Sequence, residues 1–290
     1  MPLTGRWEIF LRFMNNYEKI SLVNDQKEKT KLTIVLFEDS KTADDPKQNP
    51  NQILKQSDLI LALFSNLTKK HSLYSDSLSL IVLNQKFSRS IGCETGAAKH
   101  SDHDLLFFVD VDIAFTKEFL LRARLNTVEN KQVYYPIVFS EYDPDDPIDA
   151  LKNENSNKNH VRKNHFDFNR NNGYWRQFGF GILVTYYSDL KRVGGFDKSI
   201  VGWGKEDVDL YEKFIKSNLI IFRTVDPGLT HVFHKIECDV SLSPEQMIMC
   251  LGSKATSIAS QEVLSELCIK MKADIIEPPL LNLSLVNKKN

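Results

Sequence analysis

The feature that most limits the fold of this chain of 290 residues is a regular alternation of short apolar runs with amphipathic segments. The apolar runs predict buried strands, and apolar residues at helical spacing predict helices between them. Strands are expected at 31–37, 80–83, 105–109 and 133–139, and helices at 7–19, 53–64, 87–99, 116–126, 206–217 and 244–271. Alternation of this kind indicates an α/β fold with a mostly parallel sheet.

Two parts of the chain depart from this pattern. Residues 143–172 are rich in Asn, Asp and Lys and contain Pro144 and Pro147, which predicts a long exposed loop. Residues 1–6 lead directly into a predicted helix, whereas a sheet of this type normally opens with a strand. We therefore expect either an unusual first element or a first strand that lies upstream of this sequence.

Composition excludes several classes of protein. The 37 Lys and Arg residues are balanced by 38 Asp and Glu residues, which argues against nucleic-acid binding through bulk charge. No apolar run approaches the roughly 18 residues of a membrane-spanning helix, and the first residues lack the order of a signal peptide. The 4 cysteines lack CxxC spacing and predict neither a zinc site nor a redox site.

Two further features would matter only in a secretory lumen. Asn66 and Asn282 begin N-glycosylation sequons, although so short a pattern is often matched by chance. Cys238 and Cys250 could form a disulfide in an oxidising compartment or remain two buried thiols. Their spacing alone does not decide between these alternatives.

The first group of residues that indicates chemistry is Asp110-Val111-Asp112, which directly follows the apolar run 105–109. Ligands of open α/β sheets bind at the carboxyl ends of strands, so this position favours a site. Carboxylate oxygens suit Mn²⁺ or Mg²⁺, and either ion would neutralise a diphosphate leaving group. The alternative is structural, because aspartate is common where a loop begins after a strand.

The second group is the segment 202–209 (GWGKEDVD), at the start of a predicted helix. Glycines on both sides of Trp203 would let the loop move, and the aromatic ring between them suits stacking on a sugar. A carboxylate at the edge of such a cleft could take a proton from an attacking hydroxyl. The alternative is that the acidic residues simply favour the first turn of a helix.

Two weaker groups complete the candidates. His231 and His234 could reach one ion if the chain turns between them, and with the aspartates they would supply an octahedral Mn²⁺ shell that phosphate oxygens complete. Such a pair of histidines is more often incidental. Phe87 and Arg89 could stack on a base and hold a phosphate, or could form an ordinary helix start.

These groups and their surroundings resemble a known family. The DVD motif, GWGKEDVDLY, GGFD at 194–197 and HVFH are similar to the family-7 type of inverting β4-glycosyltransferases. YYPIVFSEYDP at 134–144, GYWRQFGFGI at 173–182 and SPEQMIMCLGSKA at 243–255 resemble, more specifically, the C-terminal domain of the chondroitin synthases. The resemblance extends over nearly the whole chain, to about residue 267, and is weak near 39–66 and in the Asn-rich loop.

The resemblance implies a GT-A fold over residues 1–273, apparently lacking its first strand, and a polar C-terminal tail at 274–290. In relatives an apolar strand runs directly into the MPL segment, so Met1 looks like a cut point. Exposed sheet edges would then make the chain fold poorly by itself. Complete chondroitin synthases resemble single-pass type II Golgi membrane proteins with a second, glucuronate-transferring domain, which implies the Golgi lumen as the location.

The activity that the resemblance implies is inverting, metal-dependent transfer of N-acetylgalactosamine from UDP-GalNAc to the terminal glucuronate of growing chondroitin, with Mn²⁺ as cofactor. Asp112 and His234 would be metal ligands, with His231 as a third. Asp207 would be the general base, and Glu206 would orient the acceptor. The residues implied to hold the donor are Pro2, Arg6, Phe87, Arg89 and Asp110, with Trp203 on a loop that closes over it.

Two other functions compete with this one. A scaffolding role, like that of the polymerising-factor members of the family, would need another chondroitin synthase-family subunit as partner and would have no use for Asp112, Asp207 and His234. A metal-dependent phosphohydrolase would use Asp110 and Asp112, but the Gly-Trp-Gly loop gives it no support. The exact donor sugar and the acceptor length stay open.

Overall fold

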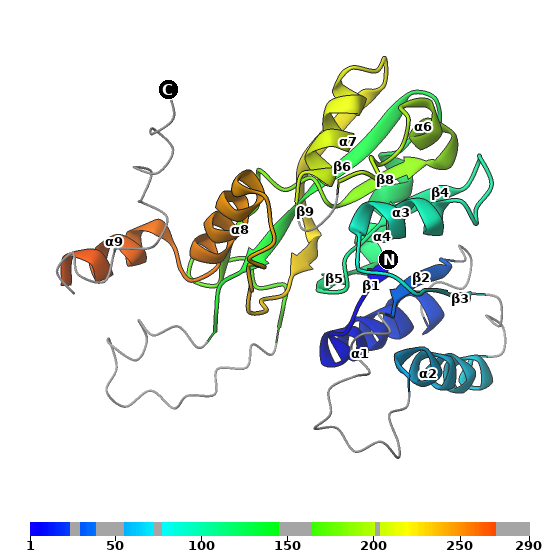
Figure 1. Ribbon diagram of the computed structural model, residues 1–290, viewed down its shortest axis with the longest axis horizontal. Coiled ribbons are helices and arrows are strands. Elements are labelled where there is room, and N and C mark those ends of the chain that lie inside the picture. The colour runs from blue at the N-terminus through cyan, green and yellow to red at the C-terminus, as the bar shows by residue number, and fades with distance from the viewer. Residues whose placement is uncertain (24–29, 39–54, 72–76, 145–163, 201–203, 271–290) are drawn as a thin grey trace.

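The first part of the chain forms a three-stranded parallel sheet. Its strands are β1 (Pro2–Leu3), β2 (Leu32–Phe37) and β3 (Leu78–Leu83), in the order β1-β2-β3. The structure is a computed structural model that describes residues 1–23, 30–38, 55–71, 77–144, 164–200 and 204–270 (Figure 1). Strand β2 is almost wholly buried, which agrees with its continuous apolar sequence.

Four helical segments accompany this sheet. They are α1 (Trp7–Tyr17), the π-helical segment η1 (Glu18–Val23), α2 (Gln56–Lys70) and α3 (Arg89–Ala97). Helix α2 contacts β3, and α3 contacts β1 and β2. Ser88 caps α3 by accepting a hydrogen bond from the Ile91 N–H, which fixes where the helix begins.

The second sheet has six strands and carries the ends that build the site (Figure 1). Its order is β4 (Leu105–Phe108), β8 (Leu183–Tyr186), β6 (Gln132–Glu141), β9 (Ile220–His231) and β5 (Ile113–Phe115), with β7 (Gly173–Trp175) paired to β6. Strands β6 and β9 run parallel, and the other pairs are antiparallel.

The helices of the second half are α4 (Lys117–Leu125), α6 (Tyr187–Arg192), α7 (Glu206–Ile215), α8 (Pro244–Thr256) and α9 (Gln261–Lys270). One core joins α1, β2 and α4 through residues such as Phe10, Ile34 and Phe119. A second core joins β6 to α7 through Tyr135 and Phe214. No helix in the described ranges has the length and apolar character that crossing a bilayer requires.

The two sheets lie side by side without hydrogen bonds between them in the part of the chain that is described. Strand β1 pairs with β2 over only two residues. A cavity of about 870 Å³ lies between β2 and β4, and residues of β3 and α3 also line it. The edge of β4 that does not pair with β8 therefore faces this cavity instead of another strand.

The structure confirms the α/β prediction, with a first sheet that is parallel and a second sheet in which β6 and β9 form the one parallel pair among the described strands. Two details are corrected. Residues 1–6 contain the strand β1, because Pro2 and Leu3 pair with Val35 and Leu36. The single helix predicted over 244–271 is two helices, because Ser260 caps a new one by accepting from the Val263 N–H. Strands β5, β7, β8 and β9 and helix α6 were not predicted.

Candidate active site

The turn between β4 and β5 places two carboxylates at the carboxyl end of β4. It contains Asp110-Val111-Asp112, and the Ile113 N–H closes it by donating to the Asp110 carbonyl oxygen over 3.2 Å. Asp112 is buried, whereas about a third of the Asp110 side chain is exposed. The two carboxylates meet different partners, which define two separate clusters.

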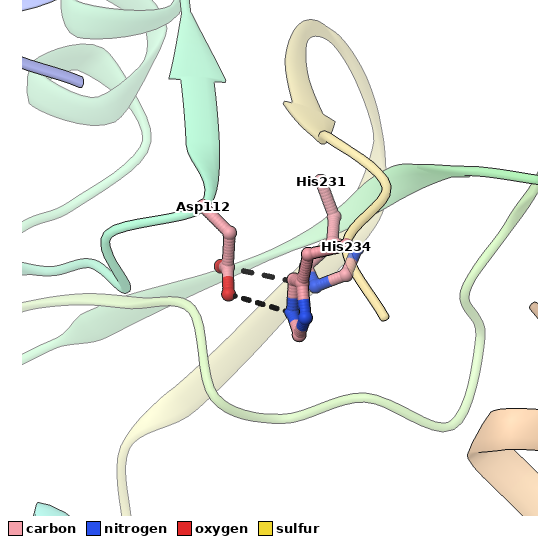
Figure 2. Close-up of side chains that lie close together, drawn as sticks. All are labelled: Asp112, His231 and His234. Carbon is pink, nitrogen blue, oxygen red and sulfur yellow. Dashed lines mark ion pairs between the residues drawn. The ribbon is translucent and has the colours of Figure 1, made fainter. Parts of the chain in front are cut away.

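The first cluster is the Asp112–His231–His234 group (Figure 2). The Nε2 atom of His234 lies 3.0 Å from Asp112 Oδ2, and that of His231 lies 3.7 Å from Oδ1. One ligand atom from each residue lies within 4.8 Å of the others. The structure thus brings both histidines to Asp112 and not to Asp110.

Backbone pairing explains why the histidines reach Asp112. Strand β9 ends at His231, which pairs with Ile113 of β5 on one side and with Ser140 of β6 on the other. The next residue, Val232, donates its N–H to the Asp112 carbonyl oxygen over 2.9 Å. The turn after β9 is thereby held directly against the 110–112 turn.

Hydrogen bonds at the far side of each ring orient the two imidazoles. His234 Nδ1 donates to the Lys235 carbonyl oxygen over 3.0 Å, which leaves Nε2 as the free lone pair. His231 Nδ1 lies 3.1 Å from Ser140 Oγ, and Arg176 donates to the same oxygen. Partners of this kind fix the orientation of metal-binding histidines.

The protonation states suit a cation. Burial lowers the pKa of His231 to about 3, so this imidazole is neutral at physiological pH. Burial acts to raise the pKa of Asp112, but the interactions of its carboxylate with His231, His234 and Arg6 outweigh burial and hold that pKa below its usual range. An ionised carboxylate beside a neutral imidazole is the state that binds a metal ion.

An Asp112 oxygen without a hydrogen-bond partner also fits a metal site. Asp112 Oδ1 is buried and has no hydrogen-bond partner among the described residues, which is costly for a carboxylate oxygen. A carboxylate and two imidazoles leave coordination positions open for other oxygen ligands, as in many divalent-metal sites. The group therefore fits a divalent cation such as Mn²⁺.

The second cluster is the Arg89–Asp110–Glu206 group. Arg89 Nε donates to Asp110 Oδ1 over 2.8 Å, and Nη2 donates to the Gly181 carbonyl oxygen over 2.6 Å. Arg89 Nη1 lies 3.6 Å from Glu206 Oε1. Burial raises the pKa of Glu206 to about 7, although the Arg89 charge opposes the shift.

The other candidate residues lie around these two clusters. Arg6 precedes α1 with φ of 50°, and its Nη1 lies 3.1 Å from Asp112 Oδ2. Asp207 is the second residue of α7, is half-buried and accepts from the Val208 N–H. Pro2 belongs to β1. Phe87 packs edge-to-face on Phe37, and Trp203 lies outside the described residues.

Three residues near the metal group were missed in the sequence. Ser140 and Glu141 end β6, and the Arg12 guanidinium lies near Asp112 and Glu141, with Nη2 lacking a hydrogen-bond partner in the described part of the chain. The signal available for the first two was the polar pair Ser-Glu that closes an otherwise apolar strand.

A disulfide joins Cys238 to Cys250, with Cα atoms 5.8 Å apart. It links the segment after His234 to α8, so the alternative of two thiols does not hold. Helix α8 begins with a capping box of Ser243 and Gln246, which fixes the same end of the helix. Asn282 lies outside the described residues, and Asn66 lies on α2.

The carboxylate–imidazole group lies at the ends of β4 and β9, and α/β folds bind their ligands at strand ends of this kind. The family model described as Chondroitin N-acetylgalactosaminyltransferase matches residues 1–264. This chain belongs to that family.

Two relatives illustrate the similarity. Chondroitin sulfate synthase 3 of Homo sapiens is 41% identical over 270 residues, covering 93% of this chain and 28% of the relative. Chondroitin sulfate N-acetylgalactosaminyltransferase 1 of Homo sapiens is 37% identical over 279 residues, covering 93% of this chain and 46% of the relative. The chain thus spans less than half the length of these curated relatives.

Solved structures of glycosyltransferases also align with the chain. The catalytic domain of Drosophila β1,4-galactosyltransferase 7 in complex with xylobiose aligns with a TM-score of 0.43 and 16% identity, covering 86% of this chain and 76% of that one. The mannosyltransferase PcManGT of Pyrobaculum calidifontis, in complex with GDP-Man and Mn²⁺, aligns with a TM-score of 0.47 and 11% identity. The alignment covers 96% of this chain and 79% of that one.

Proposed function

We propose that this chain transfers N-acetylgalactosamine, with inversion, from UDP-GalNAc to the terminal glucuronate of a growing chondroitin chain. The observation that carries the proposal is the Asp112–His231–His234 group, which fits a divalent metal in a chain of this family. The relatives' printed names support N-acetylgalactosamine as the donor sugar. The fold proposed for the whole domain is GT-A.

The three residues of this group would hold Mn²⁺. Bound there, the ion supplies positive charge that neutralises the leaving diphosphate. The donor would be bound by side chains of the second cluster and its surroundings. Arg89 is held by Asp110 and Gly181, which leaves the partly exposed Asp110 carboxylate available to a nucleotide hydroxyl.

Four further residues would complete the donor site. Arg6 is about half exposed, so its guanidinium can turn from Asp112 toward a phosphate. Phe87 is also partly exposed and offers a ring face to the base, while Pro2 lies beside α3. Trp203, which precedes α7 in the sequence, would close over the bound donor.

Asp207 would act as the general base on the acceptor. The acceptor hydroxyl oxygen forms a bond to the anomeric carbon, the bond from that carbon to the phosphate oxygen breaks, and its electron pair leaves with UDP. The hydroxyl proton passes to the Asp207 carboxylate. Inversion in one displacement needs no enzyme nucleophile, so one base is sufficient, and Glu206 would orient the acceptor beside it.

The surroundings in the cell are part of the proposal. A disulfide between Cys238 and Cys250 is favoured by an oxidising compartment, which supports the Golgi lumen as the location of the domain. A second chondroitin synthase-family subunit would be the protein partner, and the glycosaminoglycan chain the acceptor. The family relationship supports both.

Radiolabelled transfer tests the proposal. Purified chain, Mn²⁺ and labelled UDP-GalNAc are incubated with a chondroitin oligosaccharide ending in glucuronate, and incorporation is measured. Chelator should abolish transfer, and Asp207→Asn should lower kcat by about 10²–10⁴-fold, the usual contribution of a general base. Asp209→Asn is the matched control, since Asp209 lies in the same helical turn and pairs with Lys213.

Three results would count against the proposal. Full transfer by Asp207→Asn would remove Asp207 from the role of base. A folded chain that binds Mn²⁺ but transfers nothing would favour the scaffolding function instead. Release of UDP without any sugar acceptor would point to hydrolysis.

A further inference from the structure

The turn that carries both histidines is also held by a buried carboxylate on β6. Glu141 is the last residue of β6 and is 4% exposed. Its Oε2 accepts from the Phe233 N–H over 3.2 Å, and Phe233 directly precedes His234. Its Oε1 accepts from His165 Nδ1 over 2.8 Å.

His165 connects this carboxylate to the other end of the same turn. Its carbonyl oxygen accepts from Thr230 Oγ1 over 2.6 Å, and Thr230 directly precedes His231. Glu141 and His165 therefore hold Thr230 and Phe233, the two residues that immediately precede the histidines. The three hydrogen bonds and the chain segment 230–233 together form a closed ring, of which His231 and Val232 are part.

We propose that Glu141 is a positioning residue for the metal group. With His165 it fixes the 230–233 turn so that the Nε2 atoms of His231 and His234 both face Asp112. The inference rests on the proposed role of that group as a metal site. Burying a carboxylate is unfavourable unless its oxygens are well paired, and each Glu141 oxygen is paired to this turn or to His165.

His234 should depend on Glu141 more strongly than His231. His231 still belongs to β9, where pairing with Ser140 and Ile113 fixes its backbone. His234 lies beyond the end of the strand, and the nearest backbone anchors are Val232 to Asp112 and Phe233 to Glu141. Loss of the second anchor would let His234 leave the position that a metal requires.

The test compares Mn²⁺ binding by variants of the full chain. Glu141→Ala removes both bonds, whereas Glu141→Gln keeps an oxygen for Phe233 but presents an amide to His165. Glu129→Ala is the matched control, because Glu129 also accepts from a histidine, His103, and from Ser188. Glu129 precedes the opposite end of β6, and a ten-residue strand is roughly 30 Å long.

Free Mn²⁺ is quantified by electron paramagnetic resonance, at a temperature where circular dichroism shows each variant folded. Glu141→Ala should weaken Mn²⁺ binding by about 10–100-fold, the usual effect of losing a partner that orients a ligand, and Glu141→Gln by about 10-fold. Glu129→Ala should bind like the parent. If Glu141→Ala does not fold, the Mn²⁺ binding of Glu141→Gln tests the inference.

Parent-like binding by the folded Glu141 variants would overturn the inference. A parent chain that binds Mn²⁺, and loses it on Asp112→Asn but not on Glu141→Ala, would leave the proposed metal site intact and refute only the role of Glu141. A parent chain that does not bind Mn²⁺ would overturn the metal site and this inference together.

Discussion

Asp110 and Asp112 stand two residues apart in one turn, yet their surroundings differ. Asp110 already has a cation, because the Arg89 guanidinium donates to it over 2.8 Å. Asp112 faces a neutral His231 and the half-exposed Arg6, whose Nη1 lies 3.1 Å from Oδ2, and its Oδ1 lacks a hydrogen-bond partner within the described ranges. The Asp110 cluster therefore holds a largely buried cation, whereas Asp112 pairs with a half-exposed one and has donor atoms that suit an added ion.

This difference shows that the two carboxylates of a D-x-D turn can meet different partners. The turn separates the two carboxylates, and each role is set by what other elements bring to it. Helix α3 brings Arg89 to Asp110, and the end of β9 brings two imidazoles to Asp112. We infer a division of labour in which Asp112 binds metal and Asp110 serves the nucleotide.

Removal of the Arg89 guanidinium should have the largest effect on the free energy of unfolding. Arg89→Ala leaves Asp110 and Glu206 without their shared partner, so the unfolding free energy should fall by about 3 kcal/mol, as for other broken buried pairs. Mn²⁺ binding should not change. Urea unfolding and Mn²⁺ titration measure the two quantities.

Arg122→Ala is the matched control, because it breaks a pair with the buried Asp226 outside both clusters. It should also lower stability without changing Mn²⁺ binding. If Arg89→Ala weakens Mn²⁺ binding and Arg122→Ala does not, the two clusters work as one site and the comparison breaks down.

The pH dependence of the unfolding free energy should report on Glu206 in the second cluster. The pKa of Glu206 is about 7 in the fold because of burial, and it lies near 4.5 when the chain is unfolded. Between these values the folded chain binds the extra proton, so stability falls as pH rises from about 4.5 to about 7. Glu206→Gln should remove that loss and be more stable than the parent at pH 8, by roughly 1–3 kcal/mol.

Urea unfolding without nucleotide, at pH 4.5 and at pH 8, checks this expectation. The variant and the parent should differ little at the lower pH, where Glu206 is protonated in the folded chain and about half protonated in the unfolded chain. A difference of equal size at both pH values would mean that Glu206 does not titrate in this range.

Arg6→Ala should give the smallest effect. Arg6 is about half exposed and competes with a metal ion for Asp112 Oδ2. Its loss should strengthen Mn²⁺ binding by about 2- to 5-fold, since an exposed ion pair contributes under about 1 kcal/mol. Arg192→Ala is the control, because Arg192 is equally exposed and pairs with the buried Asp189. Weaker Mn²⁺ binding by Arg6→Ala would show that Arg6 supports the metal group.

Local sequence patterns were sufficient for much of the fold but not for β9. Apolar runs identify β2, β4 and β6, because continuous burial needs continuous apolar sequence. Strand β9 contains Asp226-Pro227-Gly228, which is typical of a turn. Burial of Asp226, which accepts from Arg122, Tyr134 and the Gly228 N–H, keeps that segment in the sheet.

The sequence was sufficient to list candidate site residues, but not to show that Asp110 and Asp112 belong to separate clusters. The DVD motif after a strand and the histidine pair are visible in sequence, and the structure brings Asp112 to both histidines. The separation of Asp110 from Asp112 depends on Arg89 and on Ser140, which lie far from the histidines along the chain. Such long-range contacts follow from topology and not from spacing within a motif.

The measurement that tests the central claim most directly is a Mn²⁺ titration of the parent chain, Asp110→Asn and Asp112→Asn. The two variants remove the same charge from the same turn, so they differ only in which cluster loses it. Asp112→Asn should weaken Mn²⁺ binding by more than about 100-fold, beyond what losing an outer partner causes, while Asp110→Asn binds like the parent. Equal losses in both variants, or a loss confined to Asp110→Asn, would contradict the division between the two aspartates.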